Sequence, residues 1–196
     1  MTAQTPVPLA AVTPVVEALE HLGVAYYIGG SVASQAYGAA RSTLDVDLVA
    51  DLGPQHVAPL ANALEDSYYV SRSMISEAVS RRSCFNVIHT ATSFKVDVFC
   101  VKNRSYDRLA IRRARKESID AANPALQFAL ASPEDVVLAK LEWFRLGDEI
   151  SQLQWRDVVT VLKVQQHCID RQYLEQWAAE LGVGDLLAKA WKEAES

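Results

Sequence analysis

Residues 26–49 read YYIGGSVASQAYGAARSTLDVDLV, and the rest of the chain is organised around this stretch. Its pattern predicts a short apolar strand, a Gly-Gly turn, a helix of small residues, and a second strand that carries Asp45 and Asp47. Side chains two apart on a strand share a face, so these carboxylates should lie side by side, with Cα atoms roughly 6.5 Å apart. Val46 and Leu48 then face the core. A carboxylate pair of this kind can serve one or two divalent ions.

The glycine turn that precedes the pair is suited to a phosphate group. Gly29 and Gly30 have no Cβ atom, so a phosphate could approach their backbone closely. Ser31 follows where a helix N-cap is expected, and its hydroxyl would face the same ligand as the helix N-terminus. A phosphate cradle beside two carboxylates is the arrangement that nucleotidyl transfer requires.

Gly29-Gly30-Ser31, followed by Arg41, Thr43 and Asp45-Val46-Asp47, resembles the signature of the DNA polymerase β-like nucleotidyltransferase superfamily. In that family a glycine-serine turn is followed about a dozen residues later by two aspartates that flank an apolar residue. The likeness extends to small bacterial nucleotidyltransferase-like proteins related to abortive-infection and toxin–antitoxin nucleotidyltransferases. The alternative is an ordinary α/β domain with a glycine turn and surface aspartates.

Composition narrows the class of protein. The chain has 196 residues with 50% hydrophobic content, enough for one good core or two small ones. Its net charge of −5 means that the surface as a whole does not attract nucleic acid. No apolar run approaches the roughly 20 residues of a membrane span, and the first residues lack the features of a signal peptide. Cys84, Cys100 and Cys168 form no CxxC pair, which predicts reduced thiols in a cytoplasmic protein rather than structural zinc.

A further carboxylate lies on a strand predicted at residues 94–101, which follows a short apolar strand at residues 84–89. Lys95, Asp97 and Phe99 share one face of it. An unpaired charge in the middle of a strand is costly, and a metal ion bound by Asp97 would offset that cost. The resemblance agrees, because it places a third carboxylate on a strand adjacent to the one that bears the pair. The alternative is that Asp97 simply pairs with Lys95 or with an arginine.

The resemblance and the pattern together predict an α/β (α+β) fold, in which residues 1–123 form a mixed sheet flanked by helices. Residues 1–12 are expected to be a loose lead-in, followed by a helix that Thr13 caps, Pro14 begins and Gly23 ends. Another helix is predicted at residues 55–66. For residues 74–82 both a turn of helix and a loop fit.

After Pro124 the hydrophobic period changes from 2 to 3.6, which predicts a helical subdomain at residues 124–196 that closes the cleft. An edge strand is expected at residues 127–131. The first helix starts at Ser132-Pro133, with acids in its first turn. Three more helices fit residues 151–166, 170–181 and 184–195. The four tryptophans of this half are expected in its core: Trp143, Trp155, Trp177 and Trp191.

The resemblance also implies roles in the helical half. Relatives carry a lysine after a Pro-Glu-Asp helix start, where it holds the triphosphate, and Lys140 in PEDVVLAKLEW matches it. They often carry an acidic pair on the next helix, where this chain has Asp157 but replaces the second acid by Thr160. The alternative is an ordinary solvated lysine and a structural surface formed by Asp157 and Arg156.

The function that the resemblance implies is Mg²⁺- or Mn²⁺-dependent transfer of a nucleoside monophosphate from an NTP to an acceptor. Three carboxylates would be the metal ligands and catalytic residues: Asp45, Asp47 and Asp97. The nucleotide-binding residues would be Gly29, Gly30, Ser31 and Lys140. One alternative is a degenerate nucleotide-binding module that acts as a sensor or partner subunit. Another is the toxin of a toxin–antitoxin pair, with an antitoxin-like partner protein.

Residues 102–116 run against the acidic balance of the chain, because they hold seven basic residues and one acid, Asp107. If Asp107 lies in a helix, the basic side chains form a stripe at helical spacing close to the Asp97 strand. The stripe would consist of Arg104, Arg108, Arg112 and Arg115 or Lys116. It suggests an RNA acceptor. The alternative is a solvated face that is paired with acids elsewhere.

Overall fold

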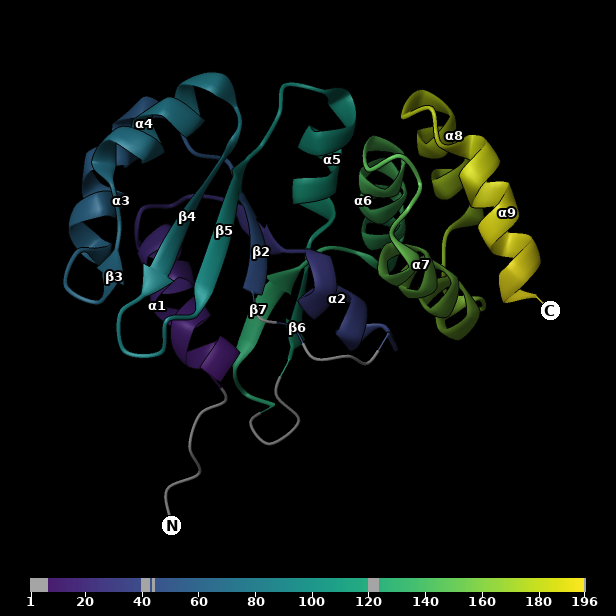
Figure 1. The fold of residues 1–196 in the computed structure, drawn as a ribbon, viewed down its shortest axis with the longest axis horizontal. Helices are drawn as coiled ribbons and strands as arrows, with labels where there is room; N and C mark the ends of the chain where they lie inside the picture. Colours follow the sequence, from purple (N-terminus) through teal and green to yellow (C-terminus); the bar gives the residue numbers. More distant parts are fainter. Residues whose placement is uncertain (1–6, 40–42, 44, 120–123, 196) are drawn as a thin grey trace, which may run out of the picture.

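The computed structural model describes residues 7–39, 43, 45–119 and 124–195. These residues contain a seven-stranded sheet in the order β3-β4-β5-β2-β1-β7-β6, with helices packed around it (Figure 1). The strands are β1 (Tyr26–Ile28), β2 (Asp45–Ala50), β3 (Tyr68–Tyr69), β4 (Cys84–His89), β5 (Lys95–Cys100), β6 (Arg115–Ser118) and β7 (Gln127–Leu130). β1 pairs with β7 and β2 with β5 in parallel, and the other neighbours are antiparallel. The predicted α/β fold with a mixed sheet is confirmed.

The helices of the described residues follow the chain as α1 (Val7–His21), α2 (Gly30–Ala36), the short 3₁₀ helix η1 (Pro54–His56), α3 (Val57–Leu64), α4 (Arg72–Arg81), α5 (Ser105–Arg113), α6 (Pro133–Leu146), α7 (Gln152–Gln165), α8 (Arg171–Glu180) and α9 (Gly184–Ala194). The four C-terminal helices agree with the prediction to within about two residues, the usual uncertainty of helix ends. Ser132 caps α6 as predicted, because its Oγ accepts a hydrogen bond from the Asp135 amide at 3.2 Å. The segment that both a helix and a loop fitted is helical, as α4.

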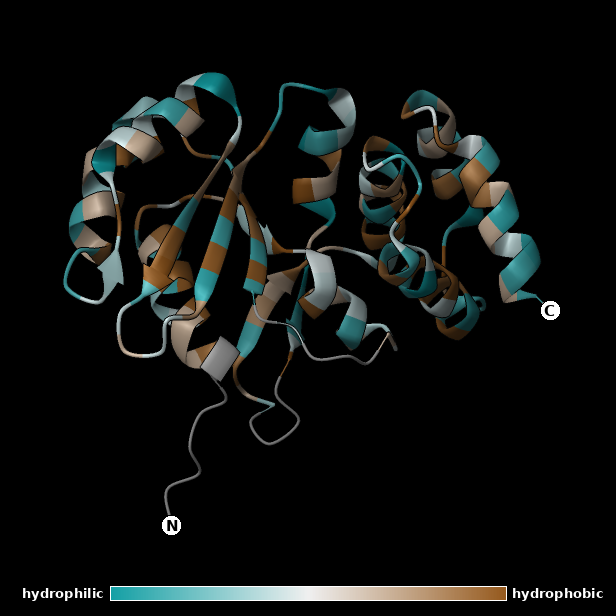
Figure 2. Ribbon diagram, in the orientation of Figure 1, coloured by the Kyte–Doolittle hydropathy of each residue, from teal (hydrophilic) through white to brown (hydrophobic). Residues whose placement is uncertain are grey.

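Alternation along β2 and β5 fixes which side chains reach the core. Val46, Leu48, Val96 and Val98 are buried, whereas the residues between them are only half-buried. Figure 2 shows this alternation as changing colours along both strands. A slip by one residue would turn every carboxylate of these strands into the core, so burial specifies the register.

Two buried hydrophobic clusters hold the fold together. Helices α1, α3 and α4 cover the apolar face of the sheet and form the first cluster with it. The second cluster joins α6, α7, α8 and α9 with parts of α2 and α5. In Figure 1 the C-terminal helices accordingly stand to one side of the sheet. The opposite face of β2 and β5 is therefore not covered by the first cluster.

Two predictions about the chain path are wrong. α1 begins at Val7 and contains Pro14 in its interior, so no lead-in extends to residue 12 and Thr13 is not a cap. An interior proline removes one backbone donor at a cost of about 3 kcal/mol, but burial of Leu9, Ala11 and Val12 favours the helical turns before it.

The strand predicted at an edge, β7, instead lies between β1 and β6. The edge belongs to β6, whose side chains are mostly exposed and charged.

The cysteines and the hydropathy of the helices bear on two expectations from composition. The three cysteines are free, with Cys84 and Cys168 exposed and Cys100 buried. Among the described helices, none combines the length and the apolar content of a membrane span.

Candidate functional site

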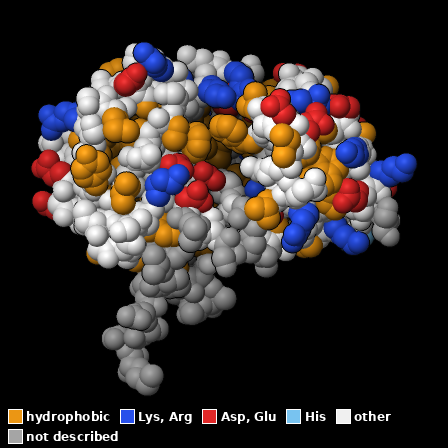
Figure 3. All heavy atoms as spheres, in the orientation of Figure 1, with side chains coloured by type: hydrophobic (Ala, Val, Ile, Leu, Met, Phe, Trp, Pro, Cys, Tyr) orange, Lys and Arg blue, Asp and Glu red, His pale blue; other side chains and the backbone are white. Residues whose placement is uncertain are grey.

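A cavity of about 310 Å³ lies between the carboxylate-bearing face of the sheet and helix α6. In the space-filling view the surface is hollowed between the sheet and the C-terminal helices, and charged side chains gather beside the hollow (Figure 3). The predicted site residues that line the cavity are Gly29, Gly30, Ser31, Asp47 and Lys140. Asp45 and Asp97 do not line it, although Asp97 lies directly opposite Asp47 in the β2–β5 pairing.

The glycine turn is built around Asp47. Gly30 has a φ of +54°, and a Cβ atom added there would lie 1.8 Å from Asp47 Oδ2. The Gly29 amide donates a hydrogen bond to the Asp47 carbonyl oxygen at 2.9 Å. The carboxylate, rather than open space for a phosphate, therefore occupies the side of Gly30 where a side chain would be. The predicted N-cap is also wrong: Gly29 occupies that position, and Ser31 lies inside the first turn of α2, where it is 8% exposed.

Asp45 and Asp97 share one positive partner, Lys95. Its Nζ lies 2.6 Å from Asp97 Oδ2 and 3.9 Å from Asp45 Oδ2, and the hydrogen bond to Asp97 raises the pKa of Lys95. The ion pair that the sequence left open for Asp97 is thus present. Thr43 donates a hydrogen bond to Asp45 Oδ1 at 2.9 Å. Arg41, the other residue of the signature, lies outside the described residues.

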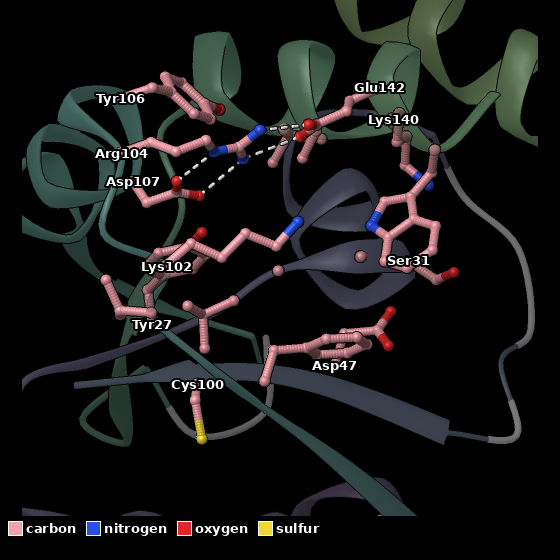
Figure 4. Close-up of a pocket in the computed structure, with 18 of the residues that line it drawn as sticks. Tyr27, Ser31, Asp47, Cys100, Lys102, Arg104, Tyr106, Asp107, Lys140 and Glu142 are labelled. Carbon is pink, nitrogen blue, oxygen red and sulfur yellow. Dashed lines mark hydrogen bonds and ion pairs between the residues drawn. The ribbon is translucent and has the colours of Figure 1, made fainter. Parts of the chain in front are cut away.

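Asp47 has the least compensated charge of the three carboxylates. Burial raises its pKa to about 6, and the nearby charges of Asp45 and Asp97 add to the effect. A carboxylate in this situation is stabilised by any cation that can reach it. The cavity provides access, because Asp47 lines its floor in Figure 4.

Within the described ranges, no three His, Cys, Asp or Glu side chains are arranged as a group that could hold a metal ion. The donor chemistry nevertheless suits Mg²⁺, which prefers carboxylate oxygens. Asp45 and Asp47 are neighbours on one face, and the raised pKa of Asp47 favours a cation there. The Oδ2 atom of Asp97 can join them only when the Lys95 ammonium leaves it. The residues therefore fit a divalent ion at the aspartate pair, and a role for Asp97 stays a prediction.

Lys140 and Asp157 form a buried ion pair in the wall of the cavity. The two side chains are 5% and 6% exposed, and Lys140 Nζ lies 2.8 Å from Asp157 Oδ2. The same ammonium donates a hydrogen bond to Gln154 Oε1 at 3.3 Å. The alternative of a solvated lysine and a surface aspartate is wrong. The positive charge that Lys140 presents to the cavity is therefore offset by the carboxylate of Asp157.

Sequence reasoning placed Arg104 and Asp107 in the basic stretch near the Asp97 strand, but it missed Glu142 and the contacts that join these side chains in the cavity (Figure 4). Arg104 donates to Asp107 through Nε at 2.5 Å and Nη2 at 2.9 Å, and it also binds Glu142. These two carboxylates raise the pKa of Arg104 far above its ordinary value. Lys102 extends into the same cavity. No motif in the sequence indicates that Glu142 of α6 meets Arg104, because the contact joins residues 38 positions apart.

An aromatic wall was also missed. Trp143 is 53% exposed and lines the cavity, so its assignment to the core is wrong, whereas Trp155 and Trp177 are buried as predicted. Its ring meets that of Phe99 edge-on, with centroids 6.0 Å apart. Phe99 shares a strand face with Asp97, which was a usable signal for this wall.

The basic stretch differs from the expected stripe. Helix α5 ends at Arg113, and Arg115 and Lys116 belong to β6, so the stripe at helical spacing does not continue to them. Arg108 lies 2.8 Å from an Asp51 oxygen and Arg113 lies 3.0 Å from a Glu134 oxygen. Together with the pairing of Arg104, these contacts favour the alternative of basic residues paired with acids elsewhere.

Comparisons with known proteins bear on the fold. No family model matches the sequence, and no curated protein sequence matches it. An antigenic nucleotidyltransferase-like protein from Paracoccidioides brasiliensis matches with a TM-score of 0.52 and 16% identity, covering 94% of this chain and 91% of that chain. The antibiotic-resistance factor ANT(2'')-Ia in solution matches with a TM-score of 0.53 and 13% identity, covering 92% and 94%. Its crystal structure with adenylyl-2''-tobramycin matches with a TM-score of 0.55 and 13% identity, covering 89% and 96%.

These proteins share the arrangement of strands and helices over nearly the whole chain. Sequence identities this low establish a common fold but not a common substrate. The chain therefore shares the fold of a nucleotidyltransferase-like protein, in line with the resemblance that its glycine-serine turn and aspartate pair suggested.

Proposed function

We propose that this protein is a nucleotidyltransferase that moves a nucleoside monophosphate from an NTP to an acceptor nucleophile and releases pyrophosphate. One observation carries the proposal: the Gly29-Gly30-Ser31 turn, Asp47 and Lys140 line a single cavity in a fold of this type. In the reaction the acceptor forms a bond to the α-phosphorus, and the bond from that phosphorus to pyrophosphate breaks.

In the proposed reaction, the residues of the glycine turn bind phosphates, and the aspartates of the sheet bind the metal ion and accept a proton. Backbone groups of Gly29 and Gly30 and the Ser31 hydroxyl bind the phosphates. Asp45 and Asp47 would hold the divalent cation, Mg²⁺ or Mn²⁺, which would supply charge neutralisation for the triphosphate and a lower pKa for the acceptor hydroxyl. Asp97 accepts the acceptor's proton after the Lys95 ammonium has moved from Oδ2.

The aromatic wall suits the nucleobase. The exposed face of Trp143 offers a surface on which a base can stack, and Phe99 supports the indole from its edge. Stacking of a base on an aromatic side chain contributes about 1–3 kcal/mol and tolerates different bases. The phosphates then lie toward the glycine turn.

A second candidate is a nucleotide-binding module that does not turn over. Two contacts favour it: Lys95 is paired with Asp97, and Lys140 is paired with Asp157. In this reading the protein binds an NTP as a sensor or partner subunit, while the two ammonium groups stay where they are.

The experiment that separates the two candidates measures binding and turnover side by side. Each of the four ribonucleoside triphosphates is titrated calorimetrically with Mg²⁺, and pyrophosphate release is followed in parallel samples that contain candidate acceptors. The acceptors are a hydroxyl-bearing small molecule such as tobramycin, total RNA, and a cell extract with labelled NTP. Binding with release supports the enzyme, and binding without release from any acceptor supports the module. Absence of NTP binding contradicts both.

The transfer of label in the extract also addresses the finer roles. Label on RNA would favour an RNA acceptor, and label on a protein would favour the toxin role with an antitoxin-like partner. Both roles, like a cytoplasmic location, stay predictions.

A further inference from the structure

The cations that line the cavity are not equivalent. Lys102, Arg104 and Lys140 all contribute to its wall, together with the carboxylates of Asp47, Asp107 and Glu142. Two of the three cations are already neutralised by acids. An anionic ligand therefore depends on the one that remains.

All the guanidinium nitrogens of Arg104 already donate hydrogen bonds to carboxylates of the protein. Its guanidinium binds both carboxylate oxygens of Asp107 and both of Glu142, so each of its nitrogens donates to an acid. A phosphate at this guanidinium would have to displace two carboxylates from bidentate contacts. Charge-assisted, bidentate bonds of this kind are among the strongest hydrogen bonds in proteins.

The ammonium of Lys140 is also bound within the protein. Its ammonium lies 2.8 Å from Asp157 and 3.3 Å from the Gln154 side-chain oxygen, and the lysine side chain is only 5% exposed. Moving the ammonium away from Asp157 would break a buried ion pair, which is strongly destabilising. The lysine that the family resemblance assigns to the triphosphate therefore has little free charge to offer.

Lys102 differs from both. It lies two residues after the end of β5, the strand that carries Asp97, and the preceding residue is held in place because the Val101 amide donates a hydrogen bond to the Ala50 carbonyl oxygen at 3.0 Å. Its side chain is exposed and reaches into the cavity, between Arg104 and Asp47 (Figure 4). Among the described residues, none forms an ion pair or hydrogen bond with its ammonium.

We infer that Lys102 is the cation that binds the phosphates of the nucleotide, and that Lys140 with Asp157 instead shapes the cavity wall. The inference rests on the proposed nucleotide site and assigns its charge to a residue outside the family signature. Lys102 is a flexible point charge with three donors, which suits a triphosphate that moves during transfer. Its recruitment breaks no ion pair within the described part of the chain, in contrast to that of Arg104 and Lys140.

The test compares ligands that differ only in their phosphates. The NTP that binds wild type most tightly is titrated with Mg²⁺ against Lys102→Met and Lys102→Arg, and the corresponding nucleoside is titrated alongside. Lys116→Met is the matched control, because Lys116 belongs to the same basic stretch but lies on β6 and does not line the cavity. We expect Lys102→Met to weaken NTP binding about 10- to 100-fold and to leave nucleoside binding unchanged within about twofold. Lys102→Arg should recover most of the loss, and Lys116→Met should match wild type.

The outcomes separate this inference from the proposed function. If wild type binds the NTP and Lys102→Met binds it equally well, the assignment of Lys102 is wrong while the nucleotide site stands. If wild type binds none of the NTPs, the proposed function fails and the inference fails with it. A further variant, Lys140→Met with Asp157→Asn, removes the buried pair without leaving a charge behind. A loss specific to phosphates in this variant, with none in Lys102→Met, would assign the phosphates to Lys140 instead.

Discussion

The carboxylate of Asp47 occupies the space in which a side chain on Gly30 would begin, since an added Cβ atom would lie 1.8 Å from Asp47 Oδ2. The two residues belong to different elements, the start of α2 and the middle of β2. Their contact sets the distance between the glycine turn and the aspartate pair. The glycine turn and the aspartate pair of the signature are thus joined by a packing contact.

Gly30→Ala should therefore damage the site and the fold together. Alanine would need a left-handed conformation, at a cost of about 1–2 kcal/mol, and would also push the Asp47 carboxylate aside. We expect a lower thermal midpoint and the loss of most nucleotide binding. Gly29→Ala is the control, because Gly29 has a negative φ and its added Cβ would come no closer than 3.5 Å to the Tyr27 ring. Equal midpoints for the two variants would contradict this account.

Asp47→Asn should stabilise the metal-free protein at neutral pH. The pKa of Asp47 is about 6 in the fold against an ordinary 3.8, so above pH 6 its charge disfavours the folded state by at most about 3 kcal/mol. As the pH falls from 6 toward 3.8 the folded state takes up a proton, and wild type regains that stability. The advantage of the variant should thus be largest near pH 7.5 and vanish near pH 4. Denaturant unfolding in EDTA at both pH values measures it, and a variant less stable than wild type at pH 7.5 would mean that the carboxylate is structural.

Asp97→Ala should separate turnover from binding. If Asp97 takes the acceptor's proton, turnover should fall about 10²- to 10⁴-fold while the NTP affinity stays close to that of wild type. Single-turnover pyrophosphate release and calorimetry give the two values. Full turnover in the variant would remove Asp97 from the mechanism.

Lys95→Met should strengthen divalent-ion binding at the carboxylates. The ammonium of Lys95 contacts Asp97 and lies near Asp45, so a cation that uses these oxygens must compete with it. Titration of Mn²⁺ followed by electron paramagnetic resonance should show tighter binding or an additional bound ion. Unchanged Mn²⁺ binding would show that the ammonium and the metal use different oxygens.

Arg113→Met should destabilise the junction of α5, α6 and α8. Arg113 reaches Glu134 and Asp135, which are both almost fully buried, and its guanidinium lies over the Tyr173 ring at 3.9 Å. Removing it leaves two buried carboxylates without their cation, at a cost of about 3–5 kcal/mol. Chemical denaturation measures the loss. Arg112→Met, from the same turn of α5, serves as the control, and a similar loss in both variants would point to the helix itself rather than to the ion pairs.

Much of the fold could be predicted because it depends on local chemistry. The alternation in DVDLVA and KVDVFC determined which faces of β2 and β5 are buried, since a strand with one apolar face has only one register that satisfies it. Ser132 and Pro133 determined the start of α6, because a cap and a fixed φ act within one turn. By the same reasoning, the sequence determined that Asp45 and Asp47 share a face.

The tertiary structure alone decided how the charges of the site are paired. Arg104 meets Glu142 of α6, and Lys140 meets Asp157 of α7, over distances along the chain that the local sequence does not reveal. For Asp97 the sequence left both a metal ion and its strand neighbour Lys95 open, and the structure shows the ion pair. The sequence also does not distinguish these paired cations from Lys102, which forms no ion pair within the described residues. It also decided that Trp143 lines a cavity while Trp155 is buried, because exposure depends on which helix packs opposite. Backbone preferences and hydrophobic period act over a few residues, whereas the electrostatics of a cavity are set by side chains that folding brings together from distant positions.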